Sequence, residues 1–121
     1  MNFRQDRAIY LQIADYITEN ILSAKWKEND RIPSTRDLAV DIEVNPNTVV
    51  RTYSSLEEKG IIYNQRGIGY FIADKALDRT KELEREIFIN EQLPQVFRLM
   101  NLLGLSIDYI RNEFDRYRSK T

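Results

Sequence analysis

The chain has 121 residues, of which 42% are hydrophobic and 31% charged, and its formal net charge is −1. It contains no cysteine and no histidine, which excludes disulfides and thiolate nucleophiles and removes the usual acid–base catalyst and the commonest metal ligands. No apolar run reaches the ~18 residues of a membrane span, and no hydrophobic stretch follows the first charges as in a signal peptide. We therefore expect a cytoplasmic globular protein that is not an enzyme and holds no metal or cofactor.

The first expected element after an extended arm at residues 1–7 is an amphipathic helix, from about Ala8 to Ala24. Its apolar residues recur at the spacing of one helix face. They are Tyr10, Ile13, Ala14, Ile17 and Ile21. A polar turn at residues 27–30 should follow.

Two capping patterns predict the next two helices. Ser34 and Asp37 have capping-box spacing, which indicates the start of a second helix with Leu38, Ala39 and Ile42 as its buried stripe. Asn45 is a favourable N-cap, and Pro46 suits the first helical position because its missing N–H costs nothing there. We expect this third helix to run to Lys59 and to stop at the glycine that follows.

A β-hairpin is expected after the third helix. The β-rich runs 61–65 and 70–73 are joined by a short turn with two glycines, Arg66-Gly67-Ile68-Gly69. Helix, helix, turn, helix and hairpin, in this order, are typical of a winged helix-turn-helix. The fold class is therefore mainly α with a small β-hairpin, and we call residues 1–73 the head.

The remaining residues, 74–121, form a second predicted domain that we call the tail. Its first helix is highly charged as far as Gln92, and Pro94 should kink or break it. Gly104-Leu105-Ser106 should end this helix and cap a last one. The apolar stripe of the first helix is Leu93, Val96, Phe97, Met100 and Leu103, and that of the last helix is Ile107, Ile110, Phe114 and Tyr117.

These two stripes predict a dimer. Two helices joined by a tight turn can cover them only partly, and an exposed apolar patch usually marks an association surface. The residues expected at the dimer interface are Leu93, Val96, Phe97, Met100, Leu103, Ile110 and Phe114. Two helices should not enclose a ligand site of ~300 Å³ as well, so we expect no dedicated small-molecule pocket. Packing of the tail on its own head is the alternative.

The outer face of the third helix points to double-stranded DNA as a partner. On a helical wheel the helix buries Val49, Tyr53 and Leu56 and exposes Asn47, Arg51 and Ser54, flanked by Thr48 and Ser55. Residues 44–56 contain no acid. In the major groove, arginine can bind guanine and asparagine can pair with adenine.

Two further segments carry groups suited to phosphate or to the minor groove. The start of the second helix offers free N–H groups and the charge of Arg36, and the hairpin tip offers Arg66 beside a glycine. The predicted DNA-binding residues are Ser34, Thr35, Arg36, Asn45, Asn47, Thr48, Arg51, Arg66 and Gly67. Against this, 18 Lys and Arg are balanced by 19 Asp and Glu, whereas DNA-binding domains are usually basic.

Four segments resemble the head of GntR-family transcription regulators in order and spacing, across residues 3–73. The segments are Ile32–Ala39, Val44–Tyr53, Leu56–Ile61 and Arg66–Ile72, and upstream Ile9–Ile13 matches the first helix. The resemblance implies operator contacts by the residues at Arg36, Asn47, Thr48 and Gly67. Some relatives carry arginine at the position of Val50, so no role for Arg51 follows from the family.

The short tail resembles that of the YtrA-like branch of the family. This resemblance implies a tail that dimerises the protein, and a bacterial regulator, typically a repressor, of the kind that often controls a transporter operon. The alternative is a winged helix used for protein binding without DNA, because the fold does not determine function. An enzyme fragment is disfavoured because the chain lacks histidine and cysteine.

Overall fold

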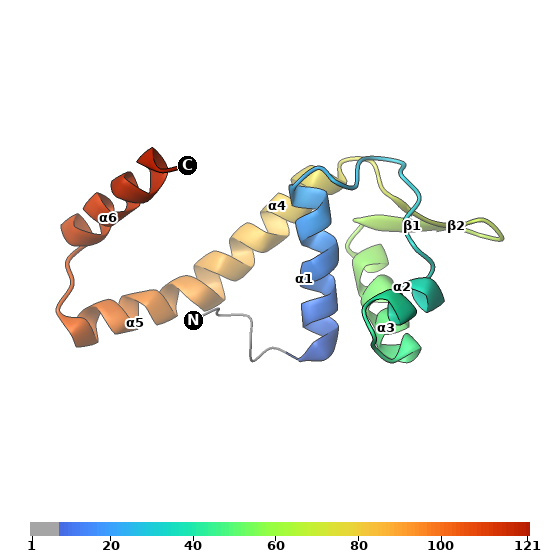
Figure 1. Ribbon diagram of the computed structural model, residues 1–121, viewed down its shortest axis with the longest axis horizontal. Coiled ribbons are helices and arrows are strands. Elements are labelled where there is room, and N and C mark those ends of the chain that lie inside the picture. Colours follow the sequence, from blue (N-terminus) through green and yellow to red (C-terminus); the bar gives the residue numbers. More distant parts are fainter. Residues whose placement is uncertain (1–7) are drawn as a thin grey trace. The chain divides into compact units, whose positions relative to one another are not determined.

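The computed structural model describes residues 8–121, so the predicted extended arm lies outside the described residues. The elements in chain order are α1 (Ile9–Leu22), α2 (Thr35–Asp41), α3 (Pro46–Glu58), β1 (Ile62–Gln65), β2 (Gly69–Ile72), α4 (Ala76–Ile87), the π-helix η1 (Phe88–Gln92), α5 (Leu93–Leu103) and α6 (Ile107–Ser119). Figure 1 labels all of them except η1. They form two compact units, divided between Glu84 and Arg85. The expected class, mainly α with one small hairpin, is confirmed.

The core of the first unit forms where α1 and α2 pack against α3. The predicted stripe of α1 is buried at Ile13, Ile17 and Ile21 and half-buried at the other two positions. The buried apolar residues are Ile13, Ile17, Ile21, Ile32, Leu38, Ala39, Val49, Tyr53, Leu56, Ile61, Ile62, Ile72 and Ala76. Every element up to the start of α4 contributes to this core, in which α3 buries Val49, Tyr53 and Leu56.

Both predicted helix caps are present. The hydroxyl oxygen of Ser34 accepts a hydrogen bond from the backbone N–H of Asp37 at 3.0 Å, at the start of α2. The side-chain oxygen of Asn45 accepts one from the N–H of Asn47 at 2.8 Å, at the start of α3. Each cap satisfies a backbone donor that the first helical turn leaves free. The turn between the two helices is therefore defined by local side chains.

The hairpin pairs β1 and β2 antiparallel, with Ile62 opposite Ile72 and Gln65 opposite Gly69. The segment before α2 pairs with the outer side of β2, through a bridge between Arg31 and Phe71. The N–H of Ile32 also donates to the carbonyl oxygen of Tyr70 at 3.0 Å. These bonds fix the hairpin to the helices, and in Figure 1 its loop projects away from them.

The beginning of α4 packs into the first unit. Ala76 and Thr80 have no exposed surface, and the Thr18 hydroxyl of α1 donates to Glu84 at 2.9 Å. The guanidinium of Arg79 donates to the carbonyl oxygen of Gly60 at 2.7 Å, beyond the end of α3. The compact unit thus extends past residue 73, while the functional division of the chain at that residue stays a prediction.

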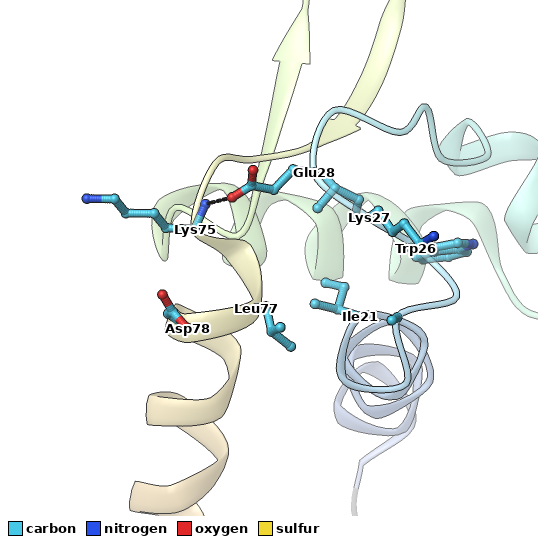
Figure 2. A pocket seen from close by; sticks show the side chains of 9 residues that line it. Ile21, Trp26, Lys27, Glu28, Lys75, Leu77 and Asp78 are labelled. Carbon is cyan, nitrogen blue, oxygen red and sulfur yellow. Dashed lines mark hydrogen bonds between the residues drawn. The ribbon is translucent and has the colours of Figure 1, made fainter.

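A cavity of about 240 Å³ lies in the first unit where α4 begins (Figure 2). Ile21, Trp26 and Leu77 supply much of its apolar lining. At its rim the backbone N–H of Lys75 donates to the carboxylate of Glu28 at 2.6 Å, the dashed bond in Figure 2. The cavity is smaller than the ~300 Å³ at which small-molecule sites begin. The hydrogen bond at its rim connects the turn after α1 to the start of α4.

Pro94 neither breaks the tail helix nor leaves it regular. The five residues of η1 form one π-helical turn directly before α5, and the N–H of Leu93 donates to the carbonyl oxygen of Phe88, five residues earlier. A proline ring crowds the carbonyl group four residues before it. The wider π turn accommodates this ring, so the helix continues. Among residues 8–121, no helix has both the length and the hydrophobicity needed to cross a bilayer.

The predicted turn between the last two helices is confirmed. After Leu103 the chain passes through Gly104 in the left-handed conformation, with φ +70°. The hydroxyl oxygen of Ser106 then accepts from the N–H of Tyr109 at 3.1 Å and begins α6. In Figure 1 the chain changes direction between α5 and α6.

Candidate nucleic-acid interface

The two faces of α3 are divided as the helical wheel predicts. Val49, Tyr53 and Leu56 are at most 1% exposed, whereas Asn47, Arg51 and Ser54 are exposed. Thr48 and Ser55 are half-buried at the margin. The structure therefore presents a surface of amide, hydroxyl and guanidinium groups, with no acid between residues 44 and 56.

Tyr53 holds α3 to two other elements. Its phenol donates to the carbonyl oxygen of Pro33 at 2.6 Å, just before α2, and its ring meets that of Tyr70 edge-on at 4.8 Å. Burial raises the pKa of the Tyr53 phenol, and Tyr70 and Tyr16 raise it further, so the group stays a neutral donor. The hydroxyl of Thr52 donates to the carbonyl oxygens of Tyr10 at 3.1 Å and Thr48 at 3.0 Å. Residue spacing alone indicates neither set of contacts.

Arg51 is exposed, but its guanidinium lies over the ring of Tyr10, 3.9 Å from the centroid. This is cation–π geometry, which favours the stacked position. The charge of Arg51 is therefore held toward α1. A DNA contact by Arg51 stays a prediction. To make this contact, the guanidinium would have to reach DNA from its stacked position over Tyr10.

The start of α2 presents Ser34 and Arg36 to solvent, with Thr35 half-buried between them. The Ser34 oxygen is occupied as an acceptor by the capping bond, and its own O–H can donate to a phosphate oxygen. Arg36 adds a positive charge beside it. Capping and phosphate binding are therefore compatible at this position.

The two glycines of the hairpin loop have different roles. Gly67 has φ +79°, and apart from its two chain neighbours no described residue has an atom within 4 Å of where its Cβ would be. Gly67 therefore serves the backbone conformation and leaves the tip open. A Cβ on Gly69 would lie 3.0 Å from the Nε atom of Arg31. Arg66, at the same tip, is exposed.

Arg31 is the residue of this interface that sequence reasoning missed. Its guanidinium donates to the carbonyl oxygen of Ile68 at 2.7 Å, across the base of the hairpin loop. The contact spans 37 positions of the chain, so no local pattern signals it. Arg31 thereby positions the loop that carries Arg66 and Gly67.

The family model described as "Bacterial regulatory proteins, gntR family" matches residues 9–72, more than half of the chain. The chain belongs to the GntR family of bacterial regulatory proteins. The match ends with β2, the last strand of the hairpin. It confirms the resemblance seen in the sequence and the winged helix-turn-helix fold.

Two relatives from Bacillus subtilis share most of their length with this GntR-family protein. The HTH-type transcriptional regulator YhcF is 44% identical over 107 residues, which are 86% of this chain and 84% of YhcF. The HTH-type transcriptional repressor YtrA is 37% identical over 106 residues, which are 87% of this chain and 80% of YtrA. The similarity to both proteins therefore extends beyond the hairpin into the tail.

Solved structures agree with this assignment. A GntR-family transcriptional regulator from Bacteroides thetaiotaomicron is 42% identical, with a TM-score of 0.77 over 93% of this chain and 98% of that one. YtrA from Sulfolobus acidocaldarius is 27% identical, with a TM-score of 0.53 over 100% and 97%. The protein is thus a DNA-binding transcriptional regulator of the GntR family and not an enzyme.

The predicted interface residues of the tail lie mostly at its surface. Phe97 is 46% exposed, Leu103 68% and Phe114 55%, while Leu93, Val96 and Ile110 are half-buried. Met100 is 7% exposed. Leu99 and Leu102 are exposed as well, which widens the apolar surface beyond the predicted stripe.

A largely apolar hollow of about 400 Å³ lies between α5 and α6. It is lined by Phe97, Met100, Asn101, Leu105 and Ile107. Its volume exceeds the ~300 Å³ that we did not expect two short helices to leave. Two of its lining residues belong to the predicted dimer interface.

Proposed function

We propose that this GntR-family protein is a cytoplasmic repressor that binds a palindromic operator as a homodimer. In this proposal residues 1–73 bind DNA and residues 74–121 join two copies. The observation that carries it is the exposed apolar surface of the tail in a single copy. The printed name of the Bacillus subtilis relative YtrA, a transcriptional repressor, supports the direction of control.

Eight large apolar side chains are exposed on α5 and α6 in a single copy. They are Phe97, Leu99, Leu102, Leu103, Ile107, Tyr109, Phe114 and Tyr117. Contiguous apolar patches larger than a few hundred Å² are uncommon on monomers and often mark association surfaces. A two-fold partner covers such a patch economically, since the same residues serve both copies.

The hollow between α5 and α6 adds a concave site to this apolar surface. A side chain of a second copy can enter the hollow and contact two of its lining residues, Phe97 and Met100. Insertion of apolar side chains into pockets is typical of the centre of a stable interface. We therefore assign the hollow to the partner copy and not to a small molecule.

A two-fold dimer determines the arrangement of the DNA site. In helix-turn-helix proteins the recognition helix lies in the major groove, and paired helices read half-sites related by inversion. The exposed face of α3 supplies the donors and acceptors for one half-site. We propose Asn47, Thr48 and Arg51 for the bases, and Ser34, Thr35, Arg36, Asn45, Arg66 and Gly67 for the backbone and the minor groove.

The YtrA-like tail extends the proposal to the target, a transporter operon. Deletion of the gene should raise transcription of that operon, and mapping of bound chromosomal sites should locate the protein at its promoter. Lower transcription after deletion would contradict repression.

Selection of bound duplexes from random DNA tests the proposal. We expect enrichment of an inverted repeat, with salt-dependent binding because phosphate contacts release counterions. Enrichment of single, unrepeated sites would contradict the dimer. Recovery of no sequence, with no retention of duplex at low salt, would contradict DNA binding and favour a protein-binding winged helix.

A further inference from the structure

Apart from the proline at its first position, one exposed residue of α3 has no hydrogen-bonding side chain. Val50 is 45% exposed and lies one turn after Asn47 and one turn before Ser54, so the three residues share a face. Valine is a poorer helix former than alanine, because its branched side chain loses freedom in a helix. Helix propensity therefore does not explain a valine at this exposed position.

The major groove of B-DNA offers this side chain one apolar target. Among the four base edges exposed there, only thymine carries a methyl group, at C5. From this chemistry and the position of the residue we infer that Val50 reads the methyl group of a thymine in each half-site. The inference rests on the proposed function and adds a specificity determinant to it.

The neighbours of Val50 fit this role. The amide of Asn47 can pair with adenine. Val50 lies three residues further along the helix, a rise of about 4.5 Å, which is close to the ~3.4 Å between base pairs. The two side chains therefore reach neighbouring base pairs. Arg51 is held over the ring of Tyr10, so its charge is drawn away from Val50. Each half-site should contain adjacent A·T pairs at the centre of the contact.

The β-branched side chain makes the contact well defined. Valine has one strongly preferred rotamer in a helix, so its two methyl groups point in fixed directions without further loss of entropy. Exposure alone does not distinguish Val50, since Val40 of α2 is 71% exposed. The difference is that Val50 stands among the hydrogen-bonding groups of α3. Val40 therefore serves as the matched control.

The experiment removes one methyl group from the DNA at a time. In the operator obtained by selection, each thymine is replaced by deoxyuridine, which pairs identically but lacks the C5 methyl group. For one thymine in each half-site we expect wild-type affinity to fall about three- to five-fold, the factor that corresponds to one buried methyl group. Val50→Ala should lose affinity for the thymine operator and bind the deoxyuridine operator no less tightly. Val40→Ala should keep the wild-type response.

Two results would overturn the inference. One is wild-type affinity that is unchanged by every replacement, or half-sites without thymine. The other is a Val50→Ala variant as sensitive to the replacement as the wild type; the variant should fold normally, since alanine is the better helix former. If selection enriches no sequence at all, the proposed function fails and the inference with it, which separates the two cases.

Discussion

The head and the tail use apolar residues differently. In the head, α1, α2, α3 and the hairpin bury their apolar stripes against one another. In the tail, Met100 is the buried residue of α5, and α6 has none among the described residues. The stripes are equally regular in both regions. The spacing of apolar residues thus predicts which face of a helix packs against another surface. It does not predict whether that surface belongs to the same chain.

The largest expected effect comes from placing charge on the tail surface. Phe97→Glu combined with Phe114→Glu should yield folded monomers, because both side chains are about half exposed in one copy. Operator affinity should fall at least about 100-fold, since two linked heads gain avidity of that order or more. Sedimentation and titration of a labelled operator measure the two effects.

Asn112→Glu is the matched control, because it adds one charge at an exposed position of α6 whose neighbours one turn away, Asp108 and Arg116, are themselves charged. It should leave both mass and affinity unchanged. Met100 is unsuitable for this test, because a charge at a site that is 7% exposed would destabilise the tail itself. If the Phe97→Glu, Phe114→Glu variant stayed dimeric, this tail surface would not be the dimer interface, and the contrast drawn between head and tail would fail.

Much of the fold could be predicted because its signals are local. The caps at Ser34, Asn45 and Ser106, the proline at the start of α3 and the glycines of the hairpin act within a few residues of themselves. Helical spacing then identifies the buried face of α3 correctly. The same local signals predict the three segments of the candidate DNA surface, which are the outer face of α3, the capped start of α2 and the hairpin loop.

The contacts that sequence reasoning missed are long-range or cooperative. Arg31 reaches the loop at Ile68, and Thr52 reaches Tyr10, 42 positions away. The stacking of Arg51 on Tyr10 likewise needs α1 and α3 to be packed first. At Pro94 the sequence indicates a disturbance, but the π turn that resolves it depends on how the backbone relaxes.

The next effect concerns the head alone. Arg36→Ala should weaken operator binding about ten- to one-hundred-fold, the usual cost of an arginine contact to phosphate or guanine. Mass and melting temperature should not change, because the residue is exposed. Arg116→Ala, the same change on the charged side of α6, should leave affinity unaffected. Equal affinity of Arg36→Ala and the wild type at physiological salt would exclude the contact.

A pair of substitutions at the hairpin tip separates conformation from charge. With φ at +79°, Gly67→Glu and Gly67→Lys should both lose about 1 kcal/mol of stability, because any side chain is strained there. Gly67→Glu should in addition bind the operator about ten-fold more weakly than Gly67→Lys, through repulsion of phosphate. Similar affinities for the two variants would show that the tip lies away from DNA.

The smallest expected effect on affinity concerns Arg31, which supports the hairpin loop. Arg31→Ala removes the hydrogen bond to the Ile68 carbonyl oxygen, which should cost about 1 kcal/mol or less at this exposed position. Operator affinity should fall by a factor of about three, since the loop is then less well positioned. Quantitative binding curves at one salt concentration are needed. A loss as large as that of Arg36→Ala would mean that Arg31 itself contacts DNA.

The mass of the wild-type protein in solution tests most directly the claim that the tail is completed by a second copy. Sedimentation equilibrium at tens of micromolar, without DNA, should give twice the 14.4 kDa of one chain. The dimer should persist on dilution well below that concentration, as expected for an apolar interface. A mass of one chain at tens of micromolar would contradict the account, because the exposed surface of α5 and α6 would then have no partner of its own kind.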